Sequence, residues 1–291
     1  NFEEDVPKVT DSFPHTVFYA EVDKFKDGII PWHWHRDVEF STLLQGNLRL
    51  STNNAVYEMK AGDGIFINSN VMHFQETLPG PPVIQTCEVF RADLISGGYH
   101  SIFEQKYVEP ILENEGLEAV LFRPTTPKHR QLLEALRTAQ DAAELEEDGF
   151  EFVVRNNLST AWMILYQEVE KTPERYRGKR HDPGGDRIKK MMLYIKDHYA
   201  EKIALEEIAA YAHISEREAL RCFRNNLNTT PFSYLMNYRC RVAAKMLEDG
   251  HDDVTNIAYA CGFASPSYFG KIFRREMGCS PTQYQKQKVS Q

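Results

Sequence analysis

The sequence predicts an α+β multidomain chain, with a β-rich first part and an all-helical last part. Residues 13–91 alternate aromatic or β-branched residues with polar ones between Gly-, Pro- and Asn-rich breaks, which favours short strands in a sandwich or small barrel. Residues 128–171 place apolar side chains at helical spacing. The last hundred residues carry one helical pattern twice, which indicates a duplicated supersecondary unit.

Composition narrows the class of protein. The chain has 291 residues, enough for two ordinary domains, and 42% hydrophobic with 26% charged residues is typical of globular proteins. We find no run of the roughly 20 apolar residues that span a bilayer, and the opening NFEEDVPKV lacks the apolar core of a signal peptide, so we expect a cytoplasmic protein without membrane contact. The five cysteines are scattered, which favours free buried thiols over disulfides or a zinc site.

The β-rich part, residues 1–122, ends in a mixed segment. Phe103, Tyr107 and Ile111 recur every four residues, which predicts a short helix that packs one face over the mouth of the barrel. Ordinary packing is the favoured role for these side chains, and ligand contact is the alternative.

A helical hairpin is predicted next, within residues 123–172. Its second helix, 150–171, carries a wider apolar stripe than one partner helix covers. We therefore expect the hairpin to pack on the barrel and to supply a homodimer contact. A single internal helix pair in a monomer is the alternative.

The segment 173–185 is charged, ends in Pro-Gly-Gly and has no periodicity, so we interpret it as a linker. The last domain, 186–291, is predicted to begin with Asp186 capping a helix. This domain carries 16 Lys/Arg against 12 Asp/Glu, a net charge of +4, whereas the rest of the chain carries −12. A basic end on an acidic body suits contact of that end with phosphate.

Two helix-turn-helix units, 205–226 and 254–276, make up the repeat. Ile208-Ala209 recurs 49 residues later, but Phe223, Pro231 and Tyr234 recur after 50, so one residue is inserted near Ala264. Gly262 in the second turn suits a positive φ, and the first copy has His213 there instead. Ser215 and Ser265 are predicted to cap the second helix of each unit. A long helix, capped by Thr230 and ending near Glu248, is predicted between the units.

The duplicated units, the run from Ser265 to Gly278 and the closing Gly-x-Ser-Pro-x-x-Tyr ending at Tyr284 resemble the AraC-type family of bacterial transcription regulators. The resemblance implies that each unit enters one of two successive major grooves of promoter DNA. By position, Arg217, Arg221, Ser267 and Lys271 match base-facing places in the family. The outward set of DNA-contact candidates also includes residues that lie between them or that we expect to hold phosphates: Leu220, Arg224, Gly270, Arg274 and Arg275.

A second resemblance lies in the β-rich part. The pattern Gly28-x4-His33-x-His35-x3-Glu39-x6-Gly46 is nearly the first signature of the cupin family, with four residues after the first glycine where five are usual. Gly62-Asp63-Gly64 through His73 is similar to the second signature, although Asn68 stands where proline is usual. The resemblance implies a β jelly-roll, which AraC-type regulators often carry as their ligand sensor.

The candidate effector pocket comprises His33, His35, Glu39 and His73. On one regular strand the first three would face the same way, because they lie an even number of residues apart. Three imidazoles and a carboxylate suit Zn²⁺, Fe²⁺, Ni²⁺ or Mn²⁺. The alternative is a metal-free pocket that hydrogen-bonds a polar ligand.

These observations predict a dimeric regulator that is not an enzyme. A small-molecule effector, with carbohydrate as the class implied by the resemblance, would control DNA binding, and RNA polymerase is compatible as a further partner. A cupin metalloenzyme with a DNA-targeting tail is the alternative function.

Overall fold

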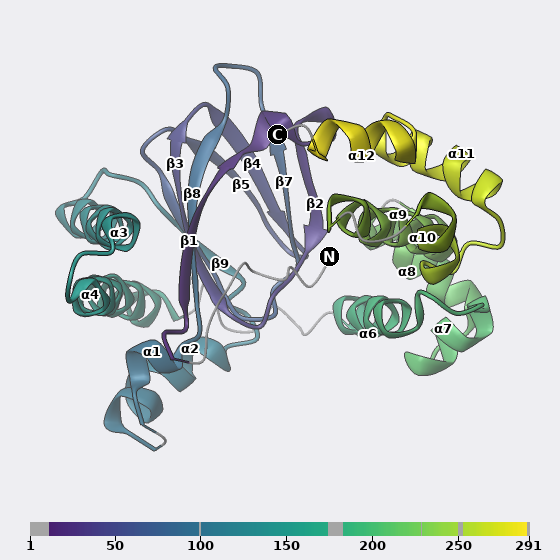
Figure 1. Cartoon of the computed structure of the whole chain (residues 1–291). Coiled ribbons are helices and arrows are strands. Elements are labelled where there is room, and N and C mark those ends of the chain that lie inside the picture. Colours follow the sequence, from purple (N-terminus) through teal and green to yellow (C-terminus); the bar gives the residue numbers. More distant parts are fainter. Residues whose placement is uncertain (1–11, 99, 174–182, 228, 250–252, 290–291) are drawn as a thin grey trace. The chain divides into compact units, whose positions relative to one another are not determined.

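A computed structural model describes residues 12–98, 100–173, 183–227, 229–249 and 253–289 (Figure 1). The chain divides into an N-terminal unit, residues 2–181, and a C-terminal unit, residues 182–291. Among the described residues, every helix is too short or too polar to cross a membrane. The five cysteines are free, and all but the partly exposed Cys279 are buried, as predicted.

The N-terminal unit contains two antiparallel sheets with the crossed strand order of a jelly-roll, which confirms the predicted fold class. The five-stranded sheet has the order β1 (His15–Glu21), β8 (Ile84–Phe90), β3 (Val38–Gln45), β6 (Gly64–Ile67), β9 (Ala119–Phe122). The four-stranded sheet has the order β2 (Ile29–His33), β7 (His73–Thr77), β4 (Asn47–Thr52), β5 (Val56–Lys60). Two 3₁₀ turns, Val22–Lys24 and Lys26–Gly28, precede β2.

Two apolar cores lie on opposite faces of the five-stranded sheet. One fills the interior between the sheets, where Leu43 and Ile65 meet Leu48 and Met59 of the other sheet. The other lies outside, beneath the hairpin of α3 (Pro127–Leu145) and α4 (Phe150–Lys171), which runs beside the sheet in Figure 1. Its aromatic rings are fully or almost fully buried: Phe40, Phe66, Phe90, Phe122 and Trp162.

The segment after β8 departs from the predicted helix. It forms α1 (Asp93–Ser96), a π-helical turn (Glu104–Val108) and α2 (Glu109–Leu112). Ile111 is buried, but Phe103 is 54% exposed, so the predicted common face is wrong. The π turn advances by i→i+5 rather than i→i+4, so residues four apart lose their alignment.

The C-terminal unit is all-helical. Its helices are α6 (Pro183–His198), α7 (Leu205–Tyr211), α8 (Glu216–Leu227), α9 (Pro231–Asp249), α10 (Val254–Ala260), α11 (Pro266–Met277) and α12 (Pro281–Val289). The predicted cap at Asp186 is wrong, because α6 already begins at Pro183, and proline suits the first helical position. The rest of the predicted linker, residues 174–182, lies outside the described residues.

The predicted repeat is confirmed. α7 and α10 are related by 49 residues and α8 and α11 by 50, so Ala264 is the inserted residue. The turns also agree: His213 has φ 56° and Gly262 has φ 78°, and the next residue donates to a carbonyl five residues back in both copies, Ile214 N to Ala209 O at 3.1 Å and Phe263 N to Ala258 O at 3.0 Å. His213 therefore holds the glycine-type turn at the cost of backbone strain.

Arg239 of α9 connects the segment after α6 to the second helix-turn-helix turn. Its Nε donates to the carbonyl oxygen of Tyr199 at 2.7 Å and its Nη2 to that of Glu201 at 2.6 Å, both just after α6. Its guanidinium lies 5.7 Å from the ring centroid of Phe263 in the second turn. The turn passes so close that a Cβ on Gly262 would lie 2.6 Å from the Ala200 carbonyl oxygen and 2.8 Å from Arg239 Nη2.

Gly262→Ala should lower the free energy of unfolding of the C-terminal unit by about 2 kcal/mol, because the added Cβ meets backbone and the residue is strained at positive φ. His213→Gly is the matched control: it relieves strain of about 1 kcal/mol but adds about 0.5–1 kcal/mol of chain entropy to the unfolded state, so the two nearly cancel. Urea unfolding measures both variants.

The optical probes separate the two units. The three tryptophans, Trp32, Trp34 and Trp162, all lie in the N-terminal unit, so their fluorescence reports that unit alone. Far-ultraviolet circular dichroism reports both units. An unchanged circular-dichroism transition in Gly262→Ala would show that the turn accepts a side chain.

Candidate nucleic-acid interface and buried histidine cluster

The second helix of each helix-turn-helix unit begins at a serine cap, as predicted. Ser215 Oγ accepts from the backbone N–H of Glu218 at 3.3 Å, and Ser265 Oγ accepts from that of Tyr268 at 3.2 Å. These caps satisfy N–H groups that would otherwise lack a partner at a helix start. α8 and α11 are therefore positioned by the same local chemistry.

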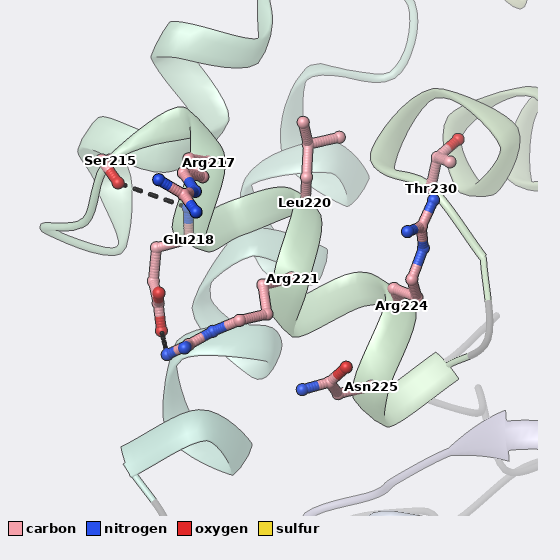
Figure 2. A pocket seen from close by; sticks show the side chains of 8 residues that line it. All are labelled: Ser215, Arg217, Glu218, Leu220, Arg221, Arg224, Asn225 and Thr230. Atoms are coloured by element: carbon pink, nitrogen blue, oxygen red, sulfur yellow. Dashed lines mark hydrogen bonds and ion pairs between the residues drawn. The ribbon is translucent and has the colours of Figure 1, made fainter.

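The inner face of α8 buries Ala219, Cys222 and Phe223, which turns the opposite face outward. The predicted contact residues all lie on that exposed face: Arg217, Leu220, Arg221 and Arg224. They line a concavity of about 700 Å³ together with Ser215, Glu218, Asn225 and Thr230 (Figure 2). An exposed apolar residue among three arginines offers both charge and a surface for a thymine methyl group.

Glu218 is a functional candidate that the sequence reasoning did not single out. Its Oε1 lies 2.6 Å from Arg221 Nη2 and 3.6 Å from Arg187 Nη1. The spacing of three residues between Glu218 and Arg221 on a helix was a usable signal for the first pair. The contact with Arg187 comes from α6 and needed the fold.

The outer face of α11 offers shorter side chains. Ser267, Lys271 and Arg274 are exposed, and Arg275 pairs with its neighbour Glu276 at 2.7 Å. A Cβ built on Gly270 meets nothing within 4 Å, so the surface there is open to a ligand. Tyr268, which takes the place of Glu218, is 47% exposed and adds an aromatic ring that we did not predict as a contact.

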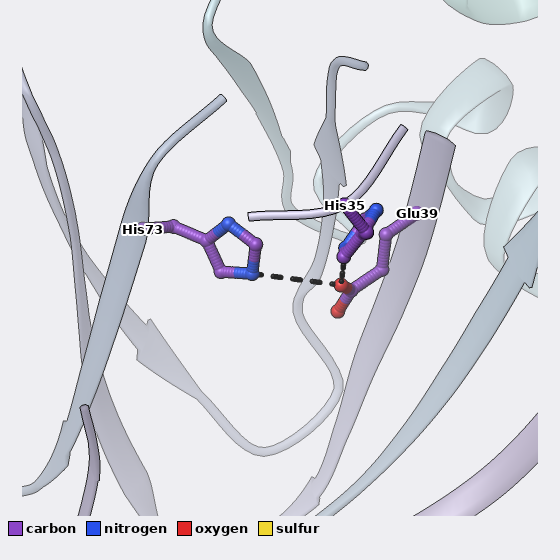
Figure 3. Close-up of side chains that lie close together, drawn as sticks. All are labelled: His35, Glu39 and His73. Atoms are coloured by element: carbon purple, nitrogen blue, oxygen red, sulfur yellow. Dashed lines mark hydrogen bonds and ion pairs between the residues drawn. The ribbon is translucent and has the colours of Figure 1, made fainter. Parts of the chain in front are cut away.

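The buried histidine cluster forms between the two sheets, not along one strand. β2 ends at His33, His35 follows in the turn, and Glu39 lies on β3 of the other sheet. The prediction that His35 and Glu39 lie close together is therefore correct, but the even spacing along one strand does not explain it. They converge because the inner faces of the sheets oppose each other, and His73 of β7 completes the group (Figure 3).

The ligand atoms of His35, Glu39 and His73 all lie within 4.8 Å of one another. His33 is not part of this group, although its ring centroid lies 3.9 Å from that of His73. Each of the three imidazoles has Nδ1 against a backbone carbonyl oxygen: His33 to Pro31 at 2.8 Å, His35 to Asp37 at 2.7 Å, His73 to Val71 at 2.9 Å. A carbonyl only accepts, so Nδ1 carries a proton in each ring, and Nε2 keeps a lone pair wherever the ring is neutral.

This tautomer creates a conflict at Glu39. His35 Nε2 lies 3.0 Å and His73 Nε2 3.7 Å from Glu39 Oε2. Burial by itself would raise the pKa of Glu39, but the hydrogen bond from His35 and the neighbouring imidazoles lower it to about 2, so the carboxyl is ionised. Two acceptors cannot face each other at 3.0 Å, so a proton on His35 or a cation must lie between them.

His73 cannot supply that positive charge. Burial, aided by the neighbouring His33, lowers the pKa of His73 to about 3, so the ring is neutral near pH 7. Its Nε2 is fully buried and makes no hydrogen bond with any residue the structure describes. A neutral imidazole held by a backbone carbonyl with a free Nε2 is the usual arrangement of a metal-ligating histidine.

The interior beyond this group remains polar on one side. Ser41 Oγ donates to Glu39 and lies 3.3 Å from the Cys87 sulfur, and Gln85 Nε2 donates to Gln75 Oε1 at 2.6 Å. Trp34, which lies between His33 and His35 in the sequence, is buried.

Comparisons with known proteins match a region in each of the two units. Residues 208–287 match the helix-turn-helix domain family, and residues 26–75 match the cupin domain family. The chain is 28% identical over 95% of its length to YdeC of Bacillus subtilis, described as an uncharacterized HTH-type transcriptional regulator, and the match covers 93% of that protein. It is 37% identical over 33% of its length to the transcriptional activator RhaS of Escherichia fergusonii, of which the match covers 34%.

Among solved structures, the chain is similar to unsaturated fatty acid-bound ToxT of Vibrio cholerae. The TM-score is 0.50 at 15% identity, over 94% of this chain and 95% of ToxT, a likeness of fold alone. The duplicated helix-turn-helix units, the jelly-roll and these matches lead to one conclusion: the chain belongs to the AraC-type transcription regulators, DNA-binding proteins that here carry an N-terminal cupin domain.

Proposed function

We propose that this regulator reads a promoter operator in the bacterial cytoplasm through α8 and α11, under the control of an effector in the jelly-roll. The exposed arginine face of α8 carries the DNA part of this proposal. Arg217 and Arg221 lie at base-facing positions, and an arginine can donate two hydrogen bonds to guanine O6 and N7. Arg224, Arg274 and Arg275 are assigned to phosphates, which fix register rather than sequence.

Selection from random duplexes with the full-length chain should yield two boxes about one helical turn, roughly 34 Å, apart. Arg221→Ala should relax the preference at one position by about 1–3 kcal/mol, because it removes a donor pair from a base edge. Arg274→Ala, the matched control, should weaken binding to all sequences alike and reduce the salt dependence by about one phosphate. Electrophoretic mobility shifts over a salt series measure both. Equal effects of the two variants would contradict the sorting of base and phosphate contacts.

We also propose that His35, Glu39 and His73 hold a divalent cation. The set fits, because two imidazoles and an ionised carboxylate are ligands for Zn²⁺, Fe²⁺, Ni²⁺ or Mn²⁺, and the buried Nε2 of His73 is otherwise without a hydrogen bond. A bound cation would supply a fixed positive charge that resolves the conflict at Glu39. His33 would then border the site rather than ligate the ion.

A metal-free polar pocket is the alternative, with a neutral sugar as the effector class. Ser41, Gln75 and Gln85 offer hydroxyl and amide groups of the kind that pair with sugar hydroxyls. ToxT binds an unsaturated fatty acid, but the ionised Glu39 disfavours a carboxylate in this interior. A polyol therefore fits the described residues better than a fatty acid.

Cobalt titration tests the cation site. Wild-type protein should bind one Co²⁺ per chain with visible d–d absorption, and Glu39→Gln should weaken binding by at least about tenfold, because it removes the anionic ligand. His33→Ala, which changes a neighbouring imidazole outside the group, should bind Co²⁺ nearly as wild type does. Equal losses in the two variants would contradict the three-residue site.

The same preparations separate the remaining possibilities. If no metal binds, a rise in Tm with neutral sugars would support the polar pocket. If neither the metal nor the sugars raise the Tm, the interior of the jelly-roll is not the effector site. A metal that changes operator affinity supports a regulator. A bound metal with turnover of a small substrate and no effect on DNA would favour a cupin metalloenzyme with a DNA-targeting tail.

We propose that the hairpin also forms a homodimer interface. One face of α4 is buried on the jelly-roll, but Phe152, Val153 and Met163 of the same helix are 71%, 40% and 39% exposed. Phe152 and Met163 are eleven residues apart, about three helical turns, so they share a face. Exposed apolar side chains on one face favour a partner helix.

Phe152→Asp should raise the dimer dissociation constant at least about tenfold, because it places a charge in an apolar contact. Sedimentation equilibrium measures the change. Phe103→Asp, which alters an aromatic residue that is 54% exposed but lies outside the hairpin, is the control and should leave the constant unchanged. A monomeric wild-type protein, or equal effects of both changes, would exclude this interface.

A further inference from the structure

Glu218 is the one acid among the eight residues that line the concavity of α8, three of which are arginines. Figure 2 shows its side chain extended toward Arg221, and its Oε1 lies 2.6 Å from Arg221 Nη2. The same oxygen lies 3.6 Å from Nη1 of Arg187 on α6. The Glu218 side chain is only 24% exposed, so this carboxylate is a built part of the surface rather than a freely solvated charge.

A carboxylate at this place opposes DNA binding in general. Non-specific affinity comes from neutralising phosphates with lysine and arginine, and Glu218 both repels phosphate and engages two of the cations. It therefore lowers affinity for any duplex. The benefit that offsets this loss of affinity is sequence specificity, gained through the ion pair of Glu218 with Arg221.

The ion pair restrains the Arg221 side chain but leaves some of its N–H donors available. A guanidinium has five N–H donors, and the contact with Glu218 engages Nη2, so donors remain for two hydrogen bonds to a base edge. An arginine held in one direction accepts the base that meets its donors and rejects others. A free arginine can bend to the nearest phosphate instead.

The second recognition helix lacks this device. At an offset of 50, Tyr268 replaces Glu218 and Lys271 replaces Arg221, although the serine caps are the same. In the described part of the chain, Lys271 forms no ion pair. Lysine is a mobile point charge, whereas arginine is a planar fork, so at this pair of equivalent positions α8 alone combines a directional donor with a group that orients it. The arginine–acid pair of α11, Arg275 with Glu276, lies four residues further along the helix.

We propose that Glu218 is a positioning residue for sequence discrimination: it aims Arg221 at a base edge and, by its charge, keeps α8 from settling on arbitrary duplex. The proposal rests on the base contact assigned to Arg221 above. It predicts the unusual combination of weaker discrimination with stronger non-specific binding when the carboxylate is removed.

Glu218→Gln in the full-length chain keeps the shape and removes the charge. Its affinity for a scrambled duplex should rise, with a salt dependence steeper by about one to two phosphates, because Arg187 and Arg221 become available to the backbone. The ratio of operator to scrambled affinity should fall at least about fivefold. Fluorescence anisotropy with both duplexes over a potassium chloride series measures the three quantities.

Glu216→Gln is the matched control, because Glu216 is an exposed acid in the same helical turn. It does not line the concavity, and the ion pair of Arg221 in the described residues is with Glu218. It should raise both affinities through charge alone and leave their ratio unchanged. A ratio in Glu218→Gln that matches the ratio in Glu216→Gln would overturn the proposal.

A double-mutant cycle with Arg221→Ala separates this proposal from the proposed base contact of Arg221 on which it rests. If Arg221→Ala relaxes no position of the operator, the base contact itself is wrong. If Arg221→Ala relaxes a position but Glu218→Gln lowers the ratio equally with and without Arg221, the base contact stands and positioning by Glu218 is wrong. Loss of the Glu218→Gln effect in the Arg221→Ala background supports positioning.

Discussion

The arrangement of the C-terminal unit depends on one buried arginine. Arg239 lies in α9, donates to carbonyl oxygens just after α6, and faces the ring of Phe263 in the second turn. Burial lowers the pKa of its guanidinium, but the group stays charged because an arginine begins so far above neutral pH. Carbonyl groups left unpaired beyond a helix end are natural acceptors for such a cation. Through this residue α9 holds the segment after α6 against the second helix-turn-helix turn.

That contact explains why the two turns differ. The second turn passes against Arg239 and Ala200, and Gly262 fits because it has no Cβ. The first turn has the same backbone but carries His213, which is exposed and strained at φ 56° rather than sterically blocked. Packing therefore demands glycine in one copy and tolerates a side chain in the other.

The two recognition helices are held alike but present different chemistry. α8 shows arginines and one orienting acid, whereas α11 shows Ser267, Gly270 and a ring at Tyr268. A helix with long directed donors suits readout of base edges, and one with small residues allows close approach of backbone to DNA. Both helices pack on α9, which lies between the two units in the sequence.

Local sequence patterns sufficed to predict the helical repeat, its inserted residue and its inward faces, since each rests on spacing within one helix or between two copies. Contacts between elements did not follow from spacing. The group of His35, Glu39 and His73 forms across two sheets, and His33 lies outside it although it shares the signature. Phe103 became exposed because a π turn shifts the helical phase, and the contact of Glu218 with Arg187 depends on how α6 packs beside α8.

β3 connects the buried cluster to the aromatic core beneath the hairpin. Glu39 points inward to the histidines, and the next residue, Phe40, points outward and meets the ring of Phe66 at 5.2 Å. Phe66 in turn meets Trp162 of α4 at 5.8 Å between ring centroids. An effector shifts the equilibrium between two conformations of a protein only by the difference in its affinity for them. Because side chains alternate along a strand, the neighbouring residues Glu39 and Phe40 of β3 belong one to the buried cluster and the other to the aromatic core beneath the hairpin.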